Sequence, residues 1–279
     1  MSVRHTAHRS AGNLSSGGWT DTLGRIGYMA KGVVYAIVGV LTAQLAFGVG
    51  GSTTGTTEAI REIGAAPLGQ IGLALTALGL VCYGTWRFIL ATMDPKREGT
   101  DPEGLVKRIG YVVSGVVNLI LGLFAGQLLI GAGSGGGSSK TGMTAELMSQ
   151  PYGLWLVGIT GCIVVGVGIY HFYRAMNATF MRNYSVGDMD ADTRQLARRI
   201  GQWGLTARGI VFAIIGIFLV RAALQRDPSE TKGLGGALDV LASQAYGPWL
   251  LGFVAVGLIA YAVYCFSYVR YRRFAEPAG

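Results

Sequence analysis

The glycine spacing G-x4-G-x6-G occurs three times in this chain of 279 residues and restricts its fold more than any other feature. The copies comprise Gly27, Gly32 and Gly39, then Gly110, Gly115 and Gly122, then Gly204, Gly209 and Gly216. Each copy opens a long apolar run, and a second apolar run follows it. Fixed-period self-similarity defines a repeating unit before any local pattern is interpreted. The sequence therefore predicts a two-helix unit that is repeated three times in tandem.

The apolar runs are long enough to cross a lipid bilayer. Of all residues 51% are hydrophobic and 14% are charged, whereas soluble domains carry about a quarter charged residues. Six runs contain almost no charge, near residues 26–48, 68–91, 109–131, 152–175, 204–224 and 248–269. About 20 helical residues span a hydrocarbon core. A soluble fold has too little polar surface to cover six such helices, so we predict an all-α polytopic membrane protein.

The three units align along both of their long helices. The first helices align at offsets of 83 and 94, which makes Lys31, Ser114 and Arg208 equivalent. The second helices align at offsets of 84 and 94. Each unit crosses the membrane twice, so the units share one orientation and are parallel repeats, unlike the inverted repeats of many transporters. We predict a pseudo-threefold ring of helical hairpins with units at 25–94, 107–177 and 199–273, after a disordered Ser/Gly-rich tail at 1–24.

The glycines are typical of helix packing in membranes. Gly32 and Gly39 are seven residues apart and share one helix face. Glycine grooves let backbones approach closely where lipid removes the hydrophobic drive between helices. A role in sliding or bending during transport is the alternative. Between the helices of each unit, the segments 49–66, 132–150 and 225–246 contain short amphipathic stretches that we expect to lie at the membrane interface.

The charge distribution predicts the orientation. Of the 23 Lys and Arg residues, 18 lie in the tails, in the loops 92–108 and 177–203, or at the adjoining helix ends. This is the positive-inside asymmetry, so both termini are predicted to be cytoplasmic. No apolar signal-peptide region precedes residue 25, so the first helix is expected to remain as the insertion signal. The net charge of +8 then indicates contact with anionic lipids at the cytoplasmic face rather than with nucleic acid.

Polar residues inside the spans are the candidates for function. Lys31 and Arg208 either form a basic ring that binds an anion or an acidic lipid, or extend to the cytoplasmic headgroups. Gln44, Gln127 and Arg221 form an equivalent layer nearer the other side. That layer either lines a polar vestibule or makes hydrogen bonds between helices.

No catalytic or cofactor-binding motif is present, so we predict no enzyme activity, no cofactor and no metal site. The six spans contain no Asp or Glu, which argues against proton-coupled transport. His171 is the one histidine beyond the N-terminal tail, and haem ligation in a bundle usually needs two. It is expected in an interfacial aromatic belt. Cys82, Cys162 and Cys265 are read as small apolar core residues.

The repeat resembles a known family. Arg25-Ile26-Gly27-Tyr28 with Gly32, and Arg108-Ile109-Gly110-Tyr111 with Gly115, carry the resemblance, whereas the third copy departs at Gln202-Trp203-Gly204-Leu205. The chain is similar over about 25–273 to a bacterial membrane family catalogued as domain of unknown function 1206, typically present in three copies. The resemblance implies a bacterial inner-membrane protein and brings no activity, cofactor or catalytic residue.

Two functions are compatible with these patterns. The first is a structural or accessory membrane component that packs against partner proteins or lipids, because the chain is rich in packing signals and lacks a chemical site. The alternative is a small-solute or anion pathway through the centre, lined by Lys31, Arg208, Gln44, Gln127 and Arg221. Convergence of these five side chains on one axis would favour the second.

Overall fold

Six long helices dominate the computed structural model, which describes residues 8–94, 99, 101–132, 140–184, 187 and 189–271, with side chains omitted at 8–18, 102–103, 106 and 140–143. The spans that are long and apolar enough to cross a membrane are Trp19–Ala46, Gly69–Thr92, Lys107–Leu129, Gly153–Met176, Ala191–Gln225 and Gly247–Tyr271. Every regular element over the described residues is helical. The prediction of a six-helix polytopic membrane protein is therefore confirmed.

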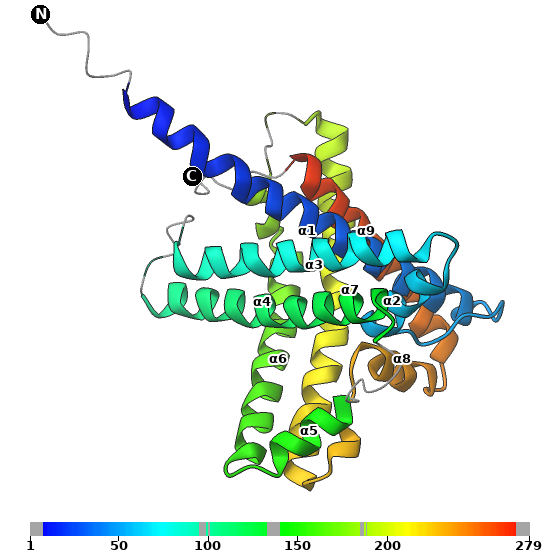
Figure 1. The fold of residues 1–279 in the computed structure, drawn as a ribbon. Helices are drawn as coiled ribbons and strands as arrows, with labels where there is room; N and C mark the ends of the chain where they lie inside the picture. The colour runs from blue at the N-terminus through cyan, green and yellow to red at the C-terminus, as the bar shows by residue number, and fades with distance from the viewer. Residues whose placement is uncertain are drawn as a thin grey trace, which may run out of the picture.

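Each unit contains a long helix, a short helix and a second long helix (Figure 1). They are α1 (His8–Ala46), α2 (Thr56–Ala65) and α3 (Gly69–Thr92), then α4 (Pro102–Leu129), α5 (Lys140–Met148) and α6 (Gly153–Met176), then α7 (Ala191–Gln225), α8 (Leu234–Ala242) and α9 (Gly247–Tyr271). Two 3-10 helices, η2 (Thr179–Asn183) and η4 (Pro228–Glu230), flank α7. We call the side with the links between units the linker side and the side with the short helices the loop side.

The first helix begins earlier than the sequence suggests. Residues 1–24 were expected to form a disordered tail, but α1 is continuous from His8, so residues 8–24 extend the membrane helix. Residues 1–7 lie outside the described part of the chain. Ser and Gly are only modest helix breakers, and a long span already supplies the helix nucleus, so tertiary context outweighs local composition here.

A glycine opens each second helix because the short helix turns sharply into it. These glycines are Gly69, Gly153 and Gly247. A Cβ at any of them would lie only 1.8–2.1 Å from a carbonyl oxygen near the end of the preceding helix. No other residue fits so close to a backbone oxygen. The same steric requirement explains why this glycine occurs in all three units.

The tightest helix pairs join neighbouring units. α3 packs along α4, α6 along α7, and α9 returns to pack along α1 (Figure 1). Within units, α1 also packs on α3 and α7 on α9, but α4 and α6 form no comparable interface over the described residues. The helices therefore follow one another around the axis as expected, but the ring is open between α4 and α6 over the described residues. The tight pairs combine the second helix of one unit with the first helix of the next.

The motif glycines explain this pairing. Eight of the nine have a neighbouring side chain or backbone within 4 Å of an added Cβ, and Gly110 is the exception. The second glycine of each motif faces a phenylalanine ring 2.6–3.1 Å from that Cβ. The three rings, Phe266, Phe88 and Phe172, occupy equivalent positions in the second helices. The second and third glycines of each motif therefore allow the close approach between units, whereas Gly27 and Gly204 face the second helix of their own unit.

Two of the short helices bury one face in the core of the bundle. Ile60 of α2 and Leu238 of α8 have no exposed surface, and both helices pack against the long helices of their own units. In contrast, α5 packs on α6 and η4. Each of α2 and α8 therefore buries one face against the bundle, and their position at the membrane interface stays a prediction.

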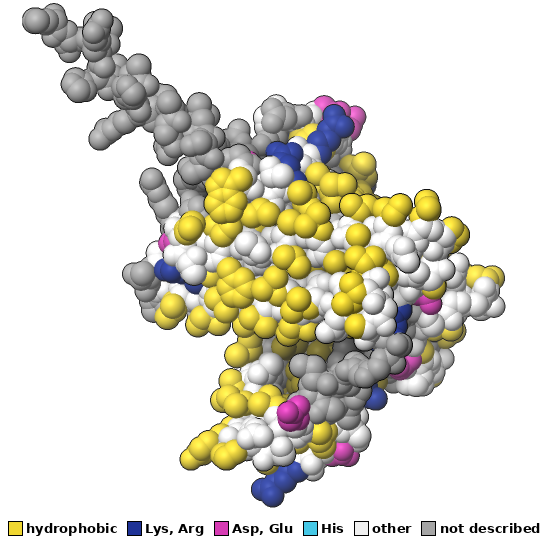
Figure 2. All heavy atoms as spheres, viewed as in Figure 1, with side chains coloured by type: hydrophobic (Ala, Val, Ile, Leu, Met, Phe, Trp, Pro, Cys, Tyr) yellow, Lys and Arg dark blue, Asp and Glu magenta, His cyan; other side chains and the backbone are white. Residues whose placement is uncertain are grey.

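The surface of the molecule fits a lipid environment. On the face over α3 and α4, apolar side chains cover the middle, and charged groups lie toward the edges (Figure 2). Large exposed apolar residues occur on every span, among them Leu75, Leu123, Ile159 and Val256. Such a surface would aggregate in water but is satisfied by acyl chains.

Candidate functional site

A central cavity of about 210 Å³ lies where the three first helices meet. Equivalent residues of all three units line it at two levels: Val34, Val117 and Val211, then Tyr35, Asn118 and Phe212. Leu80 and Leu258 of the second helices complete the apolar wall. The cavity therefore lies on the pseudo-threefold axis, and its volume is sufficient for several water molecules or a small oxyanion.

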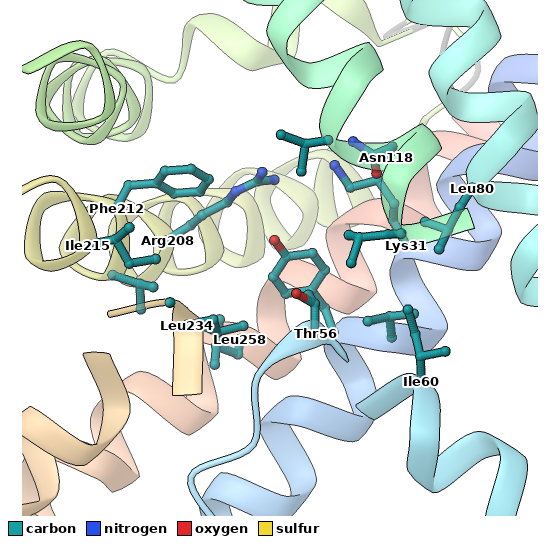
Figure 3. A pocket seen from close by; sticks show the side chains of 16 residues that line it. Lys31, Thr56, Ile60, Leu80, Asn118, Arg208, Phe212, Ile215, Leu234 and Leu258 are labelled. Atoms are coloured by element: carbon teal, nitrogen blue, oxygen red, sulfur yellow. The ribbon is translucent and has the colours of Figure 1, made fainter. Parts of the chain in front are cut away.

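Lys31 and Arg208 point into this cavity from different first helices (Figure 3). Lys31 is only 5% exposed, so it does not extend to the headgroups, and its ammonium lies 4.3 Å from the centre of the Tyr83 ring. Arg208 donates a hydrogen bond to the Tyr261 hydroxyl. The guanidinium also lies 4.9 Å from the centre of the Phe212 ring. Ring faces stabilise both cations without neutralising them.

The two cations lack an acidic counterion. The described residues give neither Lys31 nor Arg208 an ion pair, and no Asp or Glu lines the cavity. The Arg208 Nε is buried without a hydrogen-bond partner. Uncompensated charge in a membrane interior is unfavourable, and side chains of this kind usually mark a binding site or an ion pathway.

Two helix N-termini add to the positive potential. Thr56, the first residue of α2, lines the cavity together with Gly233 and Leu234 at the start of α8. The N-terminal end of a helix carries a partial positive charge and free N–H groups. Every charged or dipolar feature of the wall therefore favours an anion.

The short helices close the cavity on the loop side. The Thr53 hydroxyl donates a hydrogen bond to the Asp239 carboxylate of α8. A Cβ at Gly235 would lie 2.7 Å from the Thr53 carbonyl oxygen, so the segments before α2 and within α8 are in direct contact. These contacts join units 1 and 3 next to the residues of α2 and α8 that line the cavity.

Aromatic side chains fill the linker side. The Tyr28 ring packs edge-on against those of Tyr83 and Tyr268, with centroids 5.3 and 5.1 Å apart. The link between α6 and α7 adds Tyr184, stacked on Tyr268 at 4.8 Å, and the fully buried Phe180. The Tyr268 hydroxyl donates to the Phe180 carbonyl oxygen at 3.2 Å. The linker side of the described residues is therefore packed with aromatic rings.

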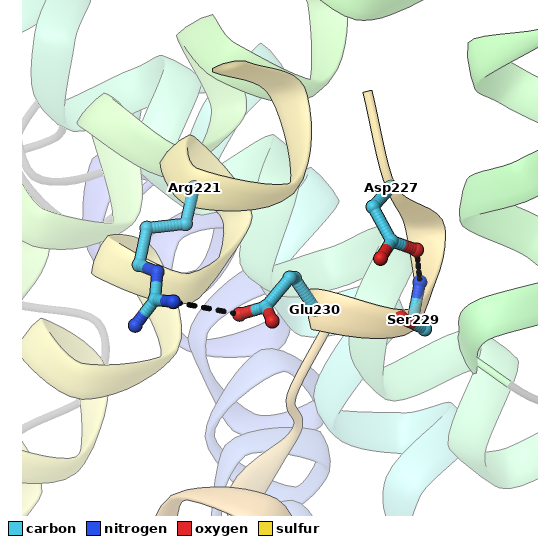
Figure 4. Close-up of polar contacts among 4 residues, drawn as sticks. All are labelled: Arg221, Asp227, Ser229 and Glu230. Carbon is cyan, nitrogen blue, oxygen red and sulfur yellow. Dashed lines mark hydrogen bonds and ion pairs between the residues drawn. The ribbon is translucent and has the colours of Figure 1, made fainter. Parts of the chain in front are cut away.

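The second predicted polar layer does not converge. Gln44, Gln127 and Arg221 are exposed and do not line the cavity. Arg221 pairs with Glu230 of η4 at 3.3 Å, because α7 ends beside this acidic turn (Figure 4). In the same turn, hydrogen bonds from Ser229 hold the pKa of Asp227 below its usual value. The structure thus brings together two of the five residues proposed for a pathway.

Sequence reasoning missed the neighbours of the two cations. Tyr35, Asn118 and Phe212 lie four residues after Lys31, Ser114 and Arg208, one helical turn further along the same face. Asn118 is buried and donates to the Ser114 carbonyl oxygen at 2.7 Å. Comparing equivalent positions one turn apart would have found this level, because a buried Asn in a membrane helix is unusual.

His171 lies behind this wall, and its edge faces the Phe212 ring at 5.6 Å. Both ring nitrogens are buried without a hydrogen-bond partner among the described residues, and the position of His171 in an interfacial aromatic belt stays a prediction. Over the described part of the chain, no three His, Cys, Asp or Glu side chains are grouped as metal ligands would be. Cys82 and Cys265 are buried free thiols, whereas Cys162 is exposed on α6 and is not a core residue.

These features define an integral membrane protein built from three two-helix repeats around one basic cavity. The chain belongs to the family described as Domain of Unknown Function (DUF1206), whose model matches residues 26–94, 109–178 and 203–272. It is also 34% identical over 246 residues to the uncharacterized protein YxxB of Bacillus subtilis (strain 168), covering 88% of this chain and 89% of that protein. No solved structure matches the chain.

Proposed function

We propose that this protein is a multi-pass protein of the bacterial inner membrane, with both termini in the cytoplasm, that binds a small anion in its central cavity. The single observation that carries the proposal is the pair of buried cations, Lys31 and Arg208, on one cavity without an acidic partner. Two helix N-termini at the same cavity support the same ligand charge. Binding is favoured over conduction because short helices and aromatic rings fill the two ends of the axis.

The packing signals do not by themselves argue for an accessory role. Eight of the nine motif glycines contact other helices of this chain, so they are not a free surface for a partner helix. No nucleic-acid role, cofactor or catalytic step is proposed. The anion is held by charge and by N–H donors, and none of the lining residues forms a nucleophile and base pair.

The proposal is tested by adding inorganic phosphate or sulfate to the protein purified in a neutral detergent. A ligand that binds only the folded state raises the midpoint of thermal unfolding as its concentration increases. Lys31→Gln and Arg208→Gln are expected to weaken binding about tenfold or more, because each removes a charged donor worth about 1.5–3 kcal/mol. Arg221→Gln is the matched control, because Arg221 lies on α7 outside the cavity and pairs with Glu230. Equal binding by all variants, or no stabilisation by either anion, would contradict the proposal.

A further inference from the structure

One interface of the ring differs from the other two. In unit 1, Ala30 of the first helix packs on Gly79 of the second, and in unit 3 Ala207 packs on Gly257. A Cβ added at Gly79 or Gly257 would lie 2.4 or 2.2 Å from the alanine Cβ. Each contact therefore requires a glycine opposite the alanine. These contacts hold the two helices of a unit together.

Unit 2 replaces the small pair with two branched side chains. Val113 and Ile163 are the equivalent residues, and they are 46% and 47% exposed. Branched side chains cannot approach as Ala and Gly do, so α4 and α6 stay apart. We call the apolar surface between them the seam; it comprises Val113 and Val117 of α4 with Ile159 and Ile163 of α6.

The cavity opens sideways onto the seam. Val117 lines the cavity and is also 50% exposed, whereas its equivalents Val34 and Val211 are buried. Leu80 and Leu258 close the wall in units 1 and 3, but their α6 equivalent, Val164, does not line the cavity. The missing wall is therefore on the side of α6, where the cavity faces the acyl chains of the bilayer.

A ligand that reaches the cavity through the seam comes from the membrane. We infer that the anion is the phosphate of an anionic phospholipid, held between Lys31 and Arg208 while an acyl chain lies along the seam. This inference rests on the proposed function and names the class of its ligand. Charge complementarity at the inner end of the seam and apolar surface along its length match the two parts of such a lipid.

The cations lie deep in the described spans. Lys31 is the thirteenth residue of the span Trp19–Ala46, and Arg208 is the eighteenth residue of the span Ala191–Gln225. A phosphate held between them therefore lies below the headgroup layer, where the two buried cations compensate its charge. The headgroup has to enter from the side, through the seam, because packed side chains lie toward both ends of the cavity.

The test compares phosphatidylglycerol with phosphatidylcholine of the same acyl chains by native mass spectrometry of the full chain. The wild type is expected to retain phosphatidylglycerol about tenfold more than phosphatidylcholine. Lys31→Gln and Arg208→Gln should abolish that preference. Ile163→Trp should fill the seam and reduce lipid retention while leaving binding of inorganic phosphate unchanged. Ile169→Trp is the matched control, because Ile169 is 62% exposed at a position that is exposed in all three units.

The outcomes separate this inference from the proposed function. If phosphate binding depends on both cations but the wild type shows no preference for phosphatidylglycerol, a soluble anion is the ligand and the lipid assignment is overturned. The same holds if Ile163→Trp and Ile169→Trp retain lipid equally. A dimer that dissociates in Ile163→Trp would assign the seam to a second copy instead. If the wild type neither binds inorganic phosphate nor prefers phosphatidylglycerol, both proposals are overturned.

Discussion

At the scale of single residues, Gly166 and Gly168 of α6 are two positions apart but have different surroundings. A Cβ at Gly168 would lie 2.9 Å from the Ala213 nitrogen and from the Gly209 carbonyl oxygen, both on α7. Nothing lies within 4 Å of a Cβ at Gly166. Backbone atoms cannot move aside as a flexible side chain can, so only Gly168 is required by its contacts.

This difference predicts opposite results for the same substitution. Gly168→Ala should separate α6 from α7 and destabilise the protein by about 1–3 kcal/mol, the usual cost of overpacking. Gly166→Ala should be neutral or slightly stabilising, because alanine favours the helix and meets no neighbour. Thermal unfolding of both variants in one detergent measures the effect. Equal shifts in the two midpoints would mean that the close approach of α6 to α7 is not important for stability.

The candidate site was predictable from equivalent positions only in part. Lys31 and Arg208 share one position in the repeat, and that equivalence indicated a basic ring near the axis. The equivalence of Gln44, Gln127 and Arg221 was just as clear but misleading. These three residues lie near the loops, where the units differ from one another. In unit 3, for example, Glu230 in the turn after α7 forms an ion pair with Arg221. Local partners that are absent from the other units decide the direction of such a side chain.

At the scale of elements, the short helices show how one sequence pattern acquires two roles. Ile63 of α2 and Leu147 of α5 occupy the same position in the repeat. Ile63 is 8% exposed and packs in the core, whereas Leu147 is 40% exposed. The difference follows from their neighbours, since α2 contacts α1, α3 and α4, but α5 contacts α6 and η4.

Truncation of these two residues should separate their roles. Ile63→Ala is expected to destabilise the protein by about 2–5 kcal/mol, because it leaves a cavity in a closed site. Leu147→Ala should cost about 1 kcal/mol or less, because its side chain is already partly exposed. Unfolding by increasing mole fractions of sodium dodecyl sulfate compares the two. A larger loss for Leu147→Ala would show that α5, and not α2, anchors the loop side.

The number of spans could be read from the sequence, but the starts of α1 and α7 and the pairing of the helices could not. Apolar length and low charge define a membrane span almost by themselves. Each first helix, however, carries glycines on more than one face, since Gly27 faces Tyr83 of α3 whereas Gly39 faces Ile259 of α9. Small residues indicate that a helix makes a close contact but do not indicate which helix is its neighbour. The tight pairs between units could therefore be identified only from the structure.

At the scale of the whole molecule, the packed side chains toward both ends of the cavity and the exposed Val117 at one side support the proposed binding rather than conduction. A pore needs a continuous polar route, but Phe180, Tyr184 and their neighbours fill the linker side of the described bundle. The threefold pattern is broken at one interface, between α4 and α6. The separation of α4 from α6 gives the repeat one surface that the other two units lack. This surface, the seam, lies next to the basic cavity.

The charges in the sequence predict the orientation of the whole molecule. Of its 23 Lys and Arg residues, 18 fall in the tails, in the links between units or at the adjoining helix ends, and six spans predict that both termini share the side of these links. The positive-inside rule then predicts that the linker side faces the cytoplasm. The loop side, with α2, α5 and α8, should face away from it.

Cysteine labelling in intact bacterial cells tests this orientation. In a chain with Cys82, Cys162 and Cys265 replaced by alanine, Ser149→Cys would report the loop side and Gly187→Cys the linker side, because both positions are exposed. A membrane-impermeant maleimide is expected to label Ser149→Cys in intact cells and Gly187→Cys only in inverted vesicles. Labelling of Gly187→Cys in intact cells would reverse the topology.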